Sequence, residues 1–265
     1  MLVLSSSLDR EVQAHKHFTG ATNIYWLNEL MRYVRSEGLL NNFRLYPMVA
    51  RTNYGTGVTV RGLGKLTGNQ MTLVNGPTWG ASGVQFVGAS SQYGAIADFL
   101  GSETLTVFAR ISHASATPTS AEPIFTQYDT GLNQRSFALY LRGDLTNDPY
   151  NLARSSDGTS ASGSFEGYVD SGGNASSSDS CLVSQWVSGG GRDFWKNKTS
   201  ISLSLVAGTA QTSRFNGPNR ILVGAQDSSG SATLFSNMTA HATAFLTGSV
   251  TTTQRETITD LINAL

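Results

Sequence analysis

The sequence has little charge, little cysteine and few histidines. Only 14% of its 265 residues are charged and the formal net charge at pH 7 is zero, so neither nucleic acid nor a membrane surface is expected as a partner. The single cysteine, Cys181, excludes an internal disulfide, and four histidines offer few zinc ligands. No apolar run reaches the roughly 18 residues of a membrane helix, and Met1 to Leu4 is too short for a signal-peptide core. We therefore expect a soluble chain.

Alternation of apolar and polar residues dominates between Leu45 and Thr247. In residues 104–111, for example, every second residue is apolar, which is typical of a half-buried strand. Residues 135–142 and 200–206 repeat the pattern, with Phe137, Leu139 and Leu141 in the first and Ile201, Leu203 and Leu205 in the second. Further predicted strands cover residues 83–87, 123–128, 181–187, 220–225 and 240–246. Turn-forming clusters separate them, so the pattern predicts an all-β fold, a two-sheet antiparallel jelly-roll sandwich.

Two helices are predicted at the ends of this region. Near the N-terminus, Thr22 or Asn23 can cap a helix that ends before Gly38, with apolar residues at helical spacing: Ile24, Leu27, Leu30, Met31 and Val34. A short C-terminal helix begins at a capping box, either Thr251 to Gln254 or Thr253 to Glu256. Its apolar face consists of Ile258, Leu261, Ile262 and Leu265.

The remaining segments lack clear periodicity. Residues 1–20 are interpreted as a polar arm, in which His15 and His17 are solvated. We therefore divide the chain into residues 1–44, an arm with an amphipathic helix, and residues 45–265, the jelly-roll with its C-terminal helix. The Ser- and Gly-rich residues 155–180 are interpreted as a long loop, which holds Phe165 and Tyr168 either partly docked or at an exposed tip.

The order of several segments carries a resemblance to a known family. Residues 83–93 look like an opening strand and turn, and residues 104–110, 124–128, 137–141 and 220–225 follow in the family's order. Residues 193–198 resemble a turn that often reads as an aromatic residue followed by Asn-Gly, with Lys198 in place of the glycine. Together, over residues 45–265, the chain resembles the concanavalin A-like lectin/glucanase superfamily, in particular its laminin-G-like branch. This resemblance implies a lectin-like sandwich.

A narrower resemblance concerns the N-terminal helix together with residues 45–47 and 72–77. This arrangement resembles laminin-G-like proteins of tailed bacteriophages that serve as decoration, tail or appendage components. It implies a non-enzymatic structural protein located in the virion, with other virion proteins and sister subunits as partners. In this interpretation Tyr25, Trp26 and Tyr33 form an aromatic assembly interface of a homo-oligomer; the other interpretation, which is favoured, is that the helix packs on the sandwich. The alternative is a carbohydrate-binding module that recognises cell-surface glycans.

Sugar binding needs an exposed aromatic ring and polar groups for hydroxyls. Trp186 and Trp195 are the candidate rings, and Tyr168, Asp193 and Asn197 complete the predicted glycan patch. The other interpretation of both tryptophans, sandwich core or oligomer contact, is the more favoured one.

Catalytic and metal-binding patterns are missing from the sequence. Glycosidases of this fold carry closely spaced carboxylates on one strand, and here no glutamate has an aspartate two positions on. Carboxylates distant in sequence could still converge in space. Asp227 with its Ser-rich neighbours, or Asp144 with Asn147 and Asp148, could contribute to a calcium site, but ordinary Asx-turns are favoured. We therefore expect no enzyme activity, no cofactor and no metal.

Overall fold

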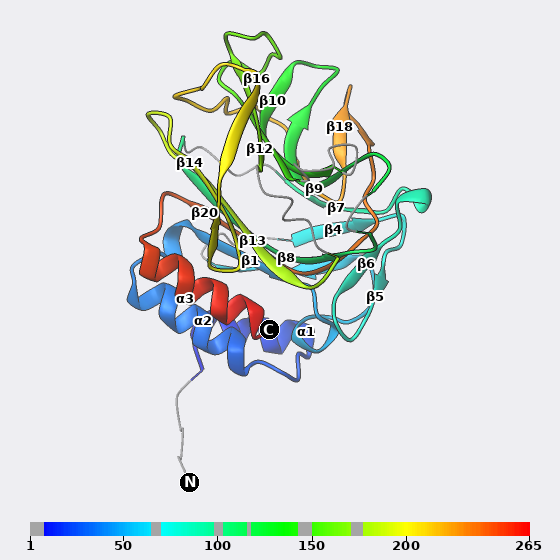
Figure 1. Cartoon of the computed structure of the whole chain (residues 1–265). Coiled ribbons are helices and arrows are strands. Elements are labelled where there is room, and N and C mark those ends of the chain that lie inside the picture. The colour runs from blue at the N-terminus through cyan, green and yellow to red at the C-terminus, as the bar shows by residue number, and fades with distance from the viewer. Residues whose placement is uncertain (1–7, 65–69, 98–102, 116–117, 143–149, 171–176) are drawn as a thin grey trace.

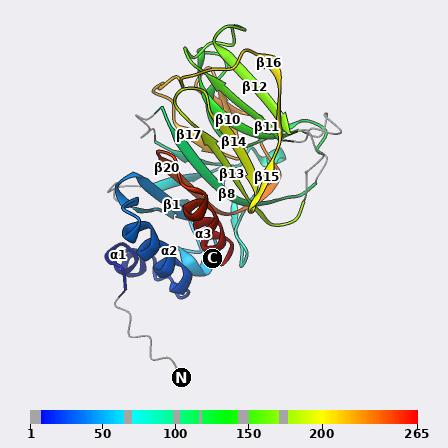
Figure 2. The same ribbon diagram turned by 60° about the vertical axis from the view of Figure 1, so that its left-hand side comes forward.

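The computed structural model describes residues 8–64, 70–97, 103–115, 118–142, 150–170 and 177–265. Within them the strands form two sheets, of nine and eleven strands, and three α-helices lie outside the first sheet (Figures 1 and 2). The strand pairs are antiparallel apart from one parallel bridge between Asp227 and Asp129. The predicted two-sheet antiparallel sandwich with an N-terminal helix and a short C-terminal helix is confirmed.

The two sheets are named A and B here. Sheet A contains β1 (Phe43–Pro47), β3 (Leu63–Gly64), β5 (Thr78–Trp79), β6 (Val84–Phe86), β8 (Leu105–His113), β13 (Ser180–Trp186), β14 (Arg192–Lys196), β15 (Thr199–Ile201) and β20 (Met238–Thr247). Sheet B contains β2 (Thr59–Arg61), β4 (Gln70–Val74), β7 (Tyr93–Ile96), β9 (Ala121–Asp129), β10 (Gln134–Arg142), β11 (Tyr150–Ser155), β12 (Phe165–Asp170), β16 (Leu203–Gly208), β17 (Ile221–Val223), β18 (Gln226–Ser228) and β19 (Ser231–Thr233).

The main core lies between the sheets and follows the predicted alternation. Leu105, Val107 and Ile111 of β8 face Phe137, Leu139 and Leu141 of β10 within one buried cluster. Since successive side chains of a strand point to opposite faces, the residues between them point away from this core. On β10 these outward residues include Ala138 and Tyr140, which lie on the open face of sheet B.

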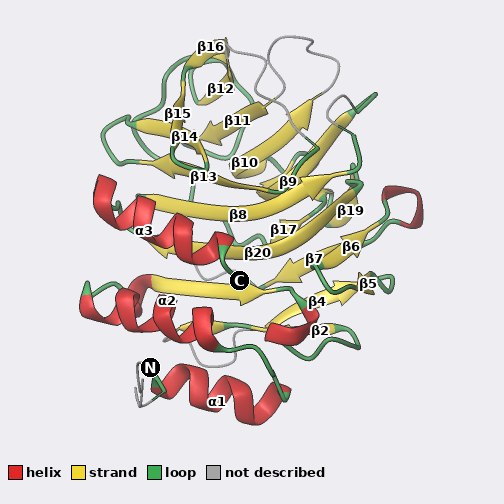
Figure 3. Cartoon of the chain, turned by 60° about the horizontal axis from the view of Figure 1, so that its bottom comes forward, coloured by secondary structure: helices red, strands yellow, loops and turns green. Residues whose placement is uncertain are grey.

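A second core lies between sheet A and the helix layer. The layer consists of α1 (Arg10–Thr19), α2 (Tyr25–Ser36) and α3 (Thr252–Asn263), which lie side by side across the sheet in Figure 3. Leu27, Leu30, Met31 and Val34 of α2 and Ile258 and Ile262 of α3 are buried there, as predicted. The capping box that begins α3 is Thr251 with Gln254, the first of the two predicted alternatives. Helix α2 begins at Tyr25 after Ile24, without the side-chain cap predicted at Thr22 or Asn23.

The interpretation of residues 1–20 as an arm is wrong for residues 10–19, which form α1. Asp9 caps this helix, because its carboxylate accepts a hydrogen bond from the Glu11 N–H at 2.9 Å, and Gly20 ends it at a positive φ of 70°. The prediction of a solvated His15 is also wrong. Its side chain is buried and its Nε2 donates to the Thr52 carbonyl oxygen at 2.7 Å. The division of the chain at residue 44 stays a prediction.

Two strand assignments also differ from the prediction. Within residues 155–180, interpreted as a loop, Phe165–Asp170 forms β12, which pairs with β11 and β16. The strand predicted over residues 200–206 is divided at Ser202: β15 pairs in sheet A and β16 in sheet B, so Leu205 leaves the core and is exposed. In Figure 2 the two strands follow one another along one side of the sandwich.

Candidate functional site

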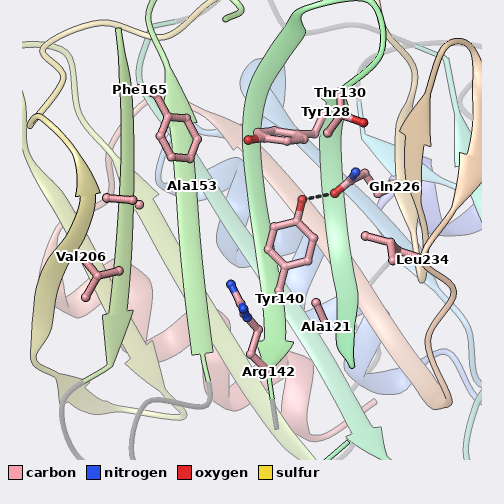
Figure 4. A pocket seen from close by; sticks show the side chains of 12 residues that line it. Ala121, Tyr128, Thr130, Tyr140, Arg142, Ala153, Phe165, Val206, Gln226 and Leu234 are labelled. Carbon is pink, nitrogen blue, oxygen red and sulfur yellow. Dashed lines mark hydrogen bonds between the residues drawn. The ribbon is translucent and has the colours of Figure 1, made fainter. Parts of the chain in front are cut away.

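The outer face of sheet B, which is turned away from both cores, carries a cavity of about 530 Å³. It extends over β9, β10, β11, β12 and β16, and the β18–β19 hairpin borders one side of it (Figure 4). We call it the sheet B groove. Its lining residues are Ala121, Tyr128, Thr130, Tyr140, Arg142, Ala153, Phe165, Gly167, Val206, Ala207, Gln226 and Leu234.

The floor of the sheet B groove is a row of small residues, Ala153, Gly167 and Ala207, on three neighbouring strands. Ala138 lies opposite Ala153, Ala153 opposite Gly167, and Gly167 opposite Ala207. A methyl group added at Gly167 would lie 3.3 Å from the Ala207 Cβ and 3.5 Å from the Phe165 ring. The absence of large side chains along this row therefore creates a shallow trough that crosses the strands.

Aromatic side chains form the walls of this trough. Tyr128 and Tyr140 meet edge to face with ring centroids 6.4 Å apart, and Phe165 stands on the other side of the trough (Figure 4). Burial raises the pKa of Tyr128 to about 12 and raises the pKa of Tyr140 well above its ordinary value. Both phenols therefore stay protonated at physiological pH.

A fixed amide completes the polar part of the groove. The Tyr140 hydroxyl donates a hydrogen bond to the Gln226 side-chain oxygen, which orients the amide (Figure 4). No described residue accepts a hydrogen bond from the Gln226 Nε2. A donor, Nε2, and an acceptor, the Tyr140 oxygen, thus lie next to each other at the groove, which suits a ligand hydroxyl group.

Asp129 holds the hairpin that carries Gln226. Its buried carboxylate accepts four backbone N–H bonds, from Gly131 and Leu132 of the β9–β10 turn and from Ser229 and Gly230 of the β18–β19 turn, at 2.7–3.0 Å. Burial alone would raise the pKa of Asp129, but the four donors together outweigh it, so the pKa lies below its ordinary value. Asp129 therefore fixes the hairpin against β9.

The sheet B groove carries little charge. Arg142 is the one charged side chain among its described lining residues, and none of them is a carboxylate. The pair of facing carboxylates that glycoside hydrolysis needs is therefore not found along this described lining.

The three aromatic residues of the predicted glycan patch do not share a surface. Trp186 is 1% exposed and lies in the core between the sheets, in edge contact with Phe125. Tyr168 faces the same core, where the Arg192 guanidinium lies 4.4 Å from its ring centroid. Trp195 points to the opposite face of sheet A, beneath α3, and Arg255 lies 4.2 Å over its ring. Both tryptophans are thus core residues, which was the alternative to the glycan patch in the sequence analysis.

The two polar residues of the patch are exposed on or next to β14. Asp193 lies on the strand, and Asn197 occupies the turn to β15 at a positive φ of 55°. The Asn197 side-chain oxygen accepts hydrogen bonds from the Cys181 N–H at 3.0 Å and from the Asn263 amide at 3.3 Å. Asn197 therefore connects the turn to β13 and α3. The five residues of the predicted patch lie on different faces of the two sheets and do not form one surface.

The predicted assembly residues all lie on α2, but their exposure differs. Tyr25 and Trp26 are 49% and 39% exposed and their rings meet edge to face at 4.8 Å. Tyr33 is half-buried and packs against the core beneath the helices. The first two residues offer an aromatic surface, whereas Tyr33 contributes to the helix layer itself.

A serine, a histidine and an aspartate meet on the outer face of sheet A. Ser112 Oγ and Asp179 Oδ1 lie 3.3 Å and 3.6 Å from the same nitrogen, Nε2, of His241. In a catalytic Ser-His-Asp triad the carboxylate binds the other ring nitrogen, which here faces the Ser82 carbonyl oxygen. The arrangement is therefore not that of a catalytic triad.

Three or more metal-ligating side chains do not gather anywhere in the described ranges.

The groove residues were not identified from the sequence. They come from segments between residues 121 and 234, so no local motif connects them. One signal was present: on β10, Tyr140 stands at an outward position between the core residues Leu139 and Leu141. A large aromatic residue on the polar face of an alternating strand indicates a surface that something covers.

Comparison with known proteins shows the fold alone. No family model matches the chain, and no curated protein matches it. Among solved structures, the sialidase of Trypanosoma rangeli in complex with 2,3-difluorosialic acid aligns over 89% of this chain and 39% of its own, with 10% identity and a TM-score of 0.57. The same sialidase in another structure gives 9% identity and a TM-score of 0.56, with the same shares covered. The chain thus spans about two fifths of the length of these sialidases.

A smaller likeness concerns the carbohydrate-binding module of family 40 from the IT-sialidase of Ruminococcus gnavus, bound to α2,3-sialyllactose. It covers 60% of this chain and 83% of the module, with 9% identity and a TM-score of 0.44. Among the described helices, none has both the length and the apolar character to cross a membrane.

Proposed function

We propose that this β-sandwich is a non-catalytic carbohydrate-binding module of the lectin-like kind, and that its ligand lies in the sheet B groove. The observation that carries the proposal is the combination of an aromatic-walled trough with an oriented donor and acceptor at Gln226 and Tyr140. Sugars present apolar C–H faces and hydroxyl groups side by side. A site for them needs both kinds of surface.

The shape of the groove favours an extended ligand. The row from Ala153 to Ala207 crosses three strands that are each about 4.8 Å apart, so its length is on the order of 10 Å. The trough therefore has room for a short oligosaccharide rather than for a single ring. The narrower assignment to the concanavalin A-like superfamily stays a prediction that is consistent with this proposal.

Two substitutions in the groove test the proposal. Phe165→Ala removes one aromatic wall, and Gln226→Leu removes the amide donor while keeping the volume of the side chain. Each is expected to weaken glycan binding by about tenfold, since stacking and a hydrogen bond each contribute on the order of 1 kcal/mol. The wild-type protein is first screened against an array of immobilised glycans, and the affinity for the best ligand is then measured by titration calorimetry.

Phe18→Ala is the matched control. Phe18 is an exposed phenylalanine on α1, on the other side of the molecule, so its replacement is expected to leave the affinity unchanged. Thermal unfolding establishes that all three variants are folded. Failure of the wild-type protein to bind any glycan, or equal affinities of the Phe165→Ala and Phe18→Ala variants, would contradict the proposal.

The virion role is a second candidate, and the exposed Tyr25–Trp26 pair on α2 favours it. An aromatic surface at the helix layer, opposite the sheet B groove, would attach the sandwich to a particle and leave the groove outward. Peptide mass spectrometry of gradient-purified particles tests this role. Stoichiometric recovery is expected, with loss of incorporation in a Trp26→Ala variant, and absence of the chain from particles refutes it.

A further inference from the structure

Leu234 is held in a backbone conformation that leucine rarely adopts. It directly follows β19, at the end of the β18–β19 hairpin, and its φ is +49°, in the left-handed region. A side chain with a Cβ is strained there, because the Cβ comes close to the following carbonyl oxygen. In the described part of the chain, the other non-glycine residues with a positive φ are all small and polar: Asn75, Ser91, Asn133, Asn197 and Ser229.

The backbone on both sides of Leu234 imposes this conformation. On one side Thr233 pairs with Gln226 within the hairpin, and on the other side the Ser236 N–H donates to the Gly224 carbonyl oxygen at 3.0 Å. The chain must therefore turn between these two anchors. The turn requires a positive φ at position 234 but not a leucine, since glycine adopts the same φ without strain.

The cores of the protein do not account for the leucine either. Its side chain is 45% exposed, whereas the next residue, Phe235, packs against a buried cluster that contains Tyr93. Leu234 instead lines the sheet B groove (Figure 4). Strained residues of this kind gather at ligand sites, where the surrounding structure fixes them. The side chain of Leu234 is therefore available to a ligand in the groove.

Leu234 lies next to the unused donor of the groove. In Figure 4 its side chain lies between the Gln226 amide and Ala121, beside the ring of Tyr140, and all four residues line the same cavity. Gln226 is only 6% exposed, and no described residue accepts a hydrogen bond from its Nε2. A buried donor without an acceptor is costly. A ligand that fits here brings an acceptor and, beside it, a small apolar group.

Few substituents of a sugar offer both. A hydroxyl group suits the polar pair of Gln226 and Tyr140 but gains nothing from the apolar side chain of Leu234. The methyl group of a 6-deoxy sugar suits the leucine but leaves the amide donor without an acceptor. An acetamido group carries a carbonyl oxygen and a methyl group on the same carbon atom, so it matches both neighbours at once.

We propose that Gln226, Leu234 and Ala121 form a subsite for the N-acetyl group of a glycan, and that the sheet B groove thereby selects N-acetylated sugars. The acetamido carbonyl oxygen accepts the hydrogen bond from the Gln226 Nε2, and the methyl group packs against Leu234 and Ala121. This inference rests on the proposed function, because it names the class of sugar that the same groove binds.

The first experiment compares matched glycans. The array carries pairs that differ only in an acetamido group or a hydroxyl group at one carbon atom, and titration calorimetry follows on the best-bound pair. The N-acetylated member is expected to bind about tenfold or more tightly, since its counterpart lacks both the methyl contact and the carbonyl acceptor. Equal affinities within the pair, or a best ligand without an acetamido group, overturn the inference and leave the proposed function standing. Binding of no glycan at all refutes both.

The second experiment removes the leucine side chain. Leu234→Ala is expected to weaken binding of the N-acetylated member by about fivefold and to leave the affinity for its counterpart unchanged. Leu205→Ala is the matched control, because Leu205 is 43% exposed but lies opposite Tyr168, whose side chain faces the core and not the groove. It is expected to change neither affinity. An equal effect of Leu234→Ala on both glycans, or the same weakening by Leu205→Ala, contradicts the subsite.

A third variant, Leu234→Gly, separates binding from folding. Glycine relieves the strain of the positive φ, so this variant is expected to unfold at the wild-type temperature or above it. It is also expected to bind the N-acetylated glycan as weakly as Leu234→Ala does. A clear decrease in the melting temperature would show that the leucine serves the fold, and wild-type affinity would show that it does not touch the ligand; either result overturns the role assigned to Leu234.

Discussion

A buried histidine on α1 makes the stability of this fold depend on pH. The His15 ring is 1% exposed, its Nε2 donates to the Thr52 carbonyl oxygen, and its Nδ1 has no hydrogen-bond partner. Burial lowers the pKa of His15 from 6.5 to about 4, since the charged form would lose its hydration. Between these two pH values the unfolded chain holds a proton at this position that the folded protein does not hold.

The sign and size of the effect follow from proton linkage. The contribution of His15 is complete above pH 6.5, the pKa in the unfolded chain, and is lost as the pH falls toward 4. One pKa unit corresponds to about 1.4 kcal/mol, so the full loss is about 3 kcal/mol. About 2 kcal/mol of it falls between pH 7 and pH 5, which corresponds to a decrease of roughly 5 °C in the melting temperature.

Urea denaturation of wild type and His15→Gln at pH 7 and pH 5 measures this effect. Glutamine can still donate an amide hydrogen to the Thr52 oxygen but does not titrate. The decrease in unfolding free energy from pH 7 to pH 5 is therefore expected to be about 2 kcal/mol smaller in His15→Gln than in wild type. Burial also lowers the pKa of His241, but that residue is present in both proteins and cancels in the comparison.

His17→Gln provides the control, because His17 is exposed and lies two residues further along the same helix. This variant is expected to show the wild-type dependence on pH. If His15→Gln loses as much stability as wild type between pH 7 and pH 5, the assignment of the pH dependence to His15 is refuted.

Three further substitutions test the cores and the groove by urea denaturation. Trp186→Ala is expected to cost about 3–5 kcal/mol because the ring fills the core between the sheets, and a loss below about 1 kcal/mol would place it at the surface. Glu166→Gln leaves the Arg154 guanidinium, 2.9 Å from the Glu166 carboxylate, without a counter-charge in the interior, and a loss of about 3–5 kcal/mol is expected; a near-neutral effect would show that Arg154 finds another partner. Asp129→Asn removes the charge and replaces one of the two oxygens that accept from four N–H groups by an amide donor, and it is expected to cost about 2 kcal/mol. It is also expected to weaken glycan binding by displacing Gln226, and unchanged affinity would separate the hairpin from the site.

The sheets and two of the three helices could be predicted because their patterns are strong. Leu27, Leu30, Met31 and Val34 recur at helical spacing on α2, and every second residue is apolar from 105 to 111 on β8 and from 137 to 141 on β10. Helix α1 lacks such a signal. Only Val12 and His15 of its ten residues are buried, and one of these two is polar. The neighbouring surface, rather than apolar periodicity, decides the position of this helix.

The candidate site could not be predicted for a different reason. Its floor depends on the register of three strands, which aligns Ala153, Gly167 and Ala207, and none of these residues differs in type from an ordinary strand residue. Trp186 and Trp195 are candidate sugar-binding residues from the sequence because exposed aromatic rings bind sugars. Their burial, however, follows from which face of sheet A each one occupies and from the cover that α3 provides over Trp195. Neither fact is local in the sequence.

The single thiol of the chain can report how often the helix layer separates from sheet A. Cys181 lies between sheet A and α3, is fully buried, and burial raises its pKa to about 12. A thiol reagent in solution therefore meets no thiolate until the helix layer lifts away from the sheet. The labelling rate of Cys181 measures how often that separation occurs. Because Cys181 faces the helix layer and not the core between the sheets, this rate reports the opening of the helices.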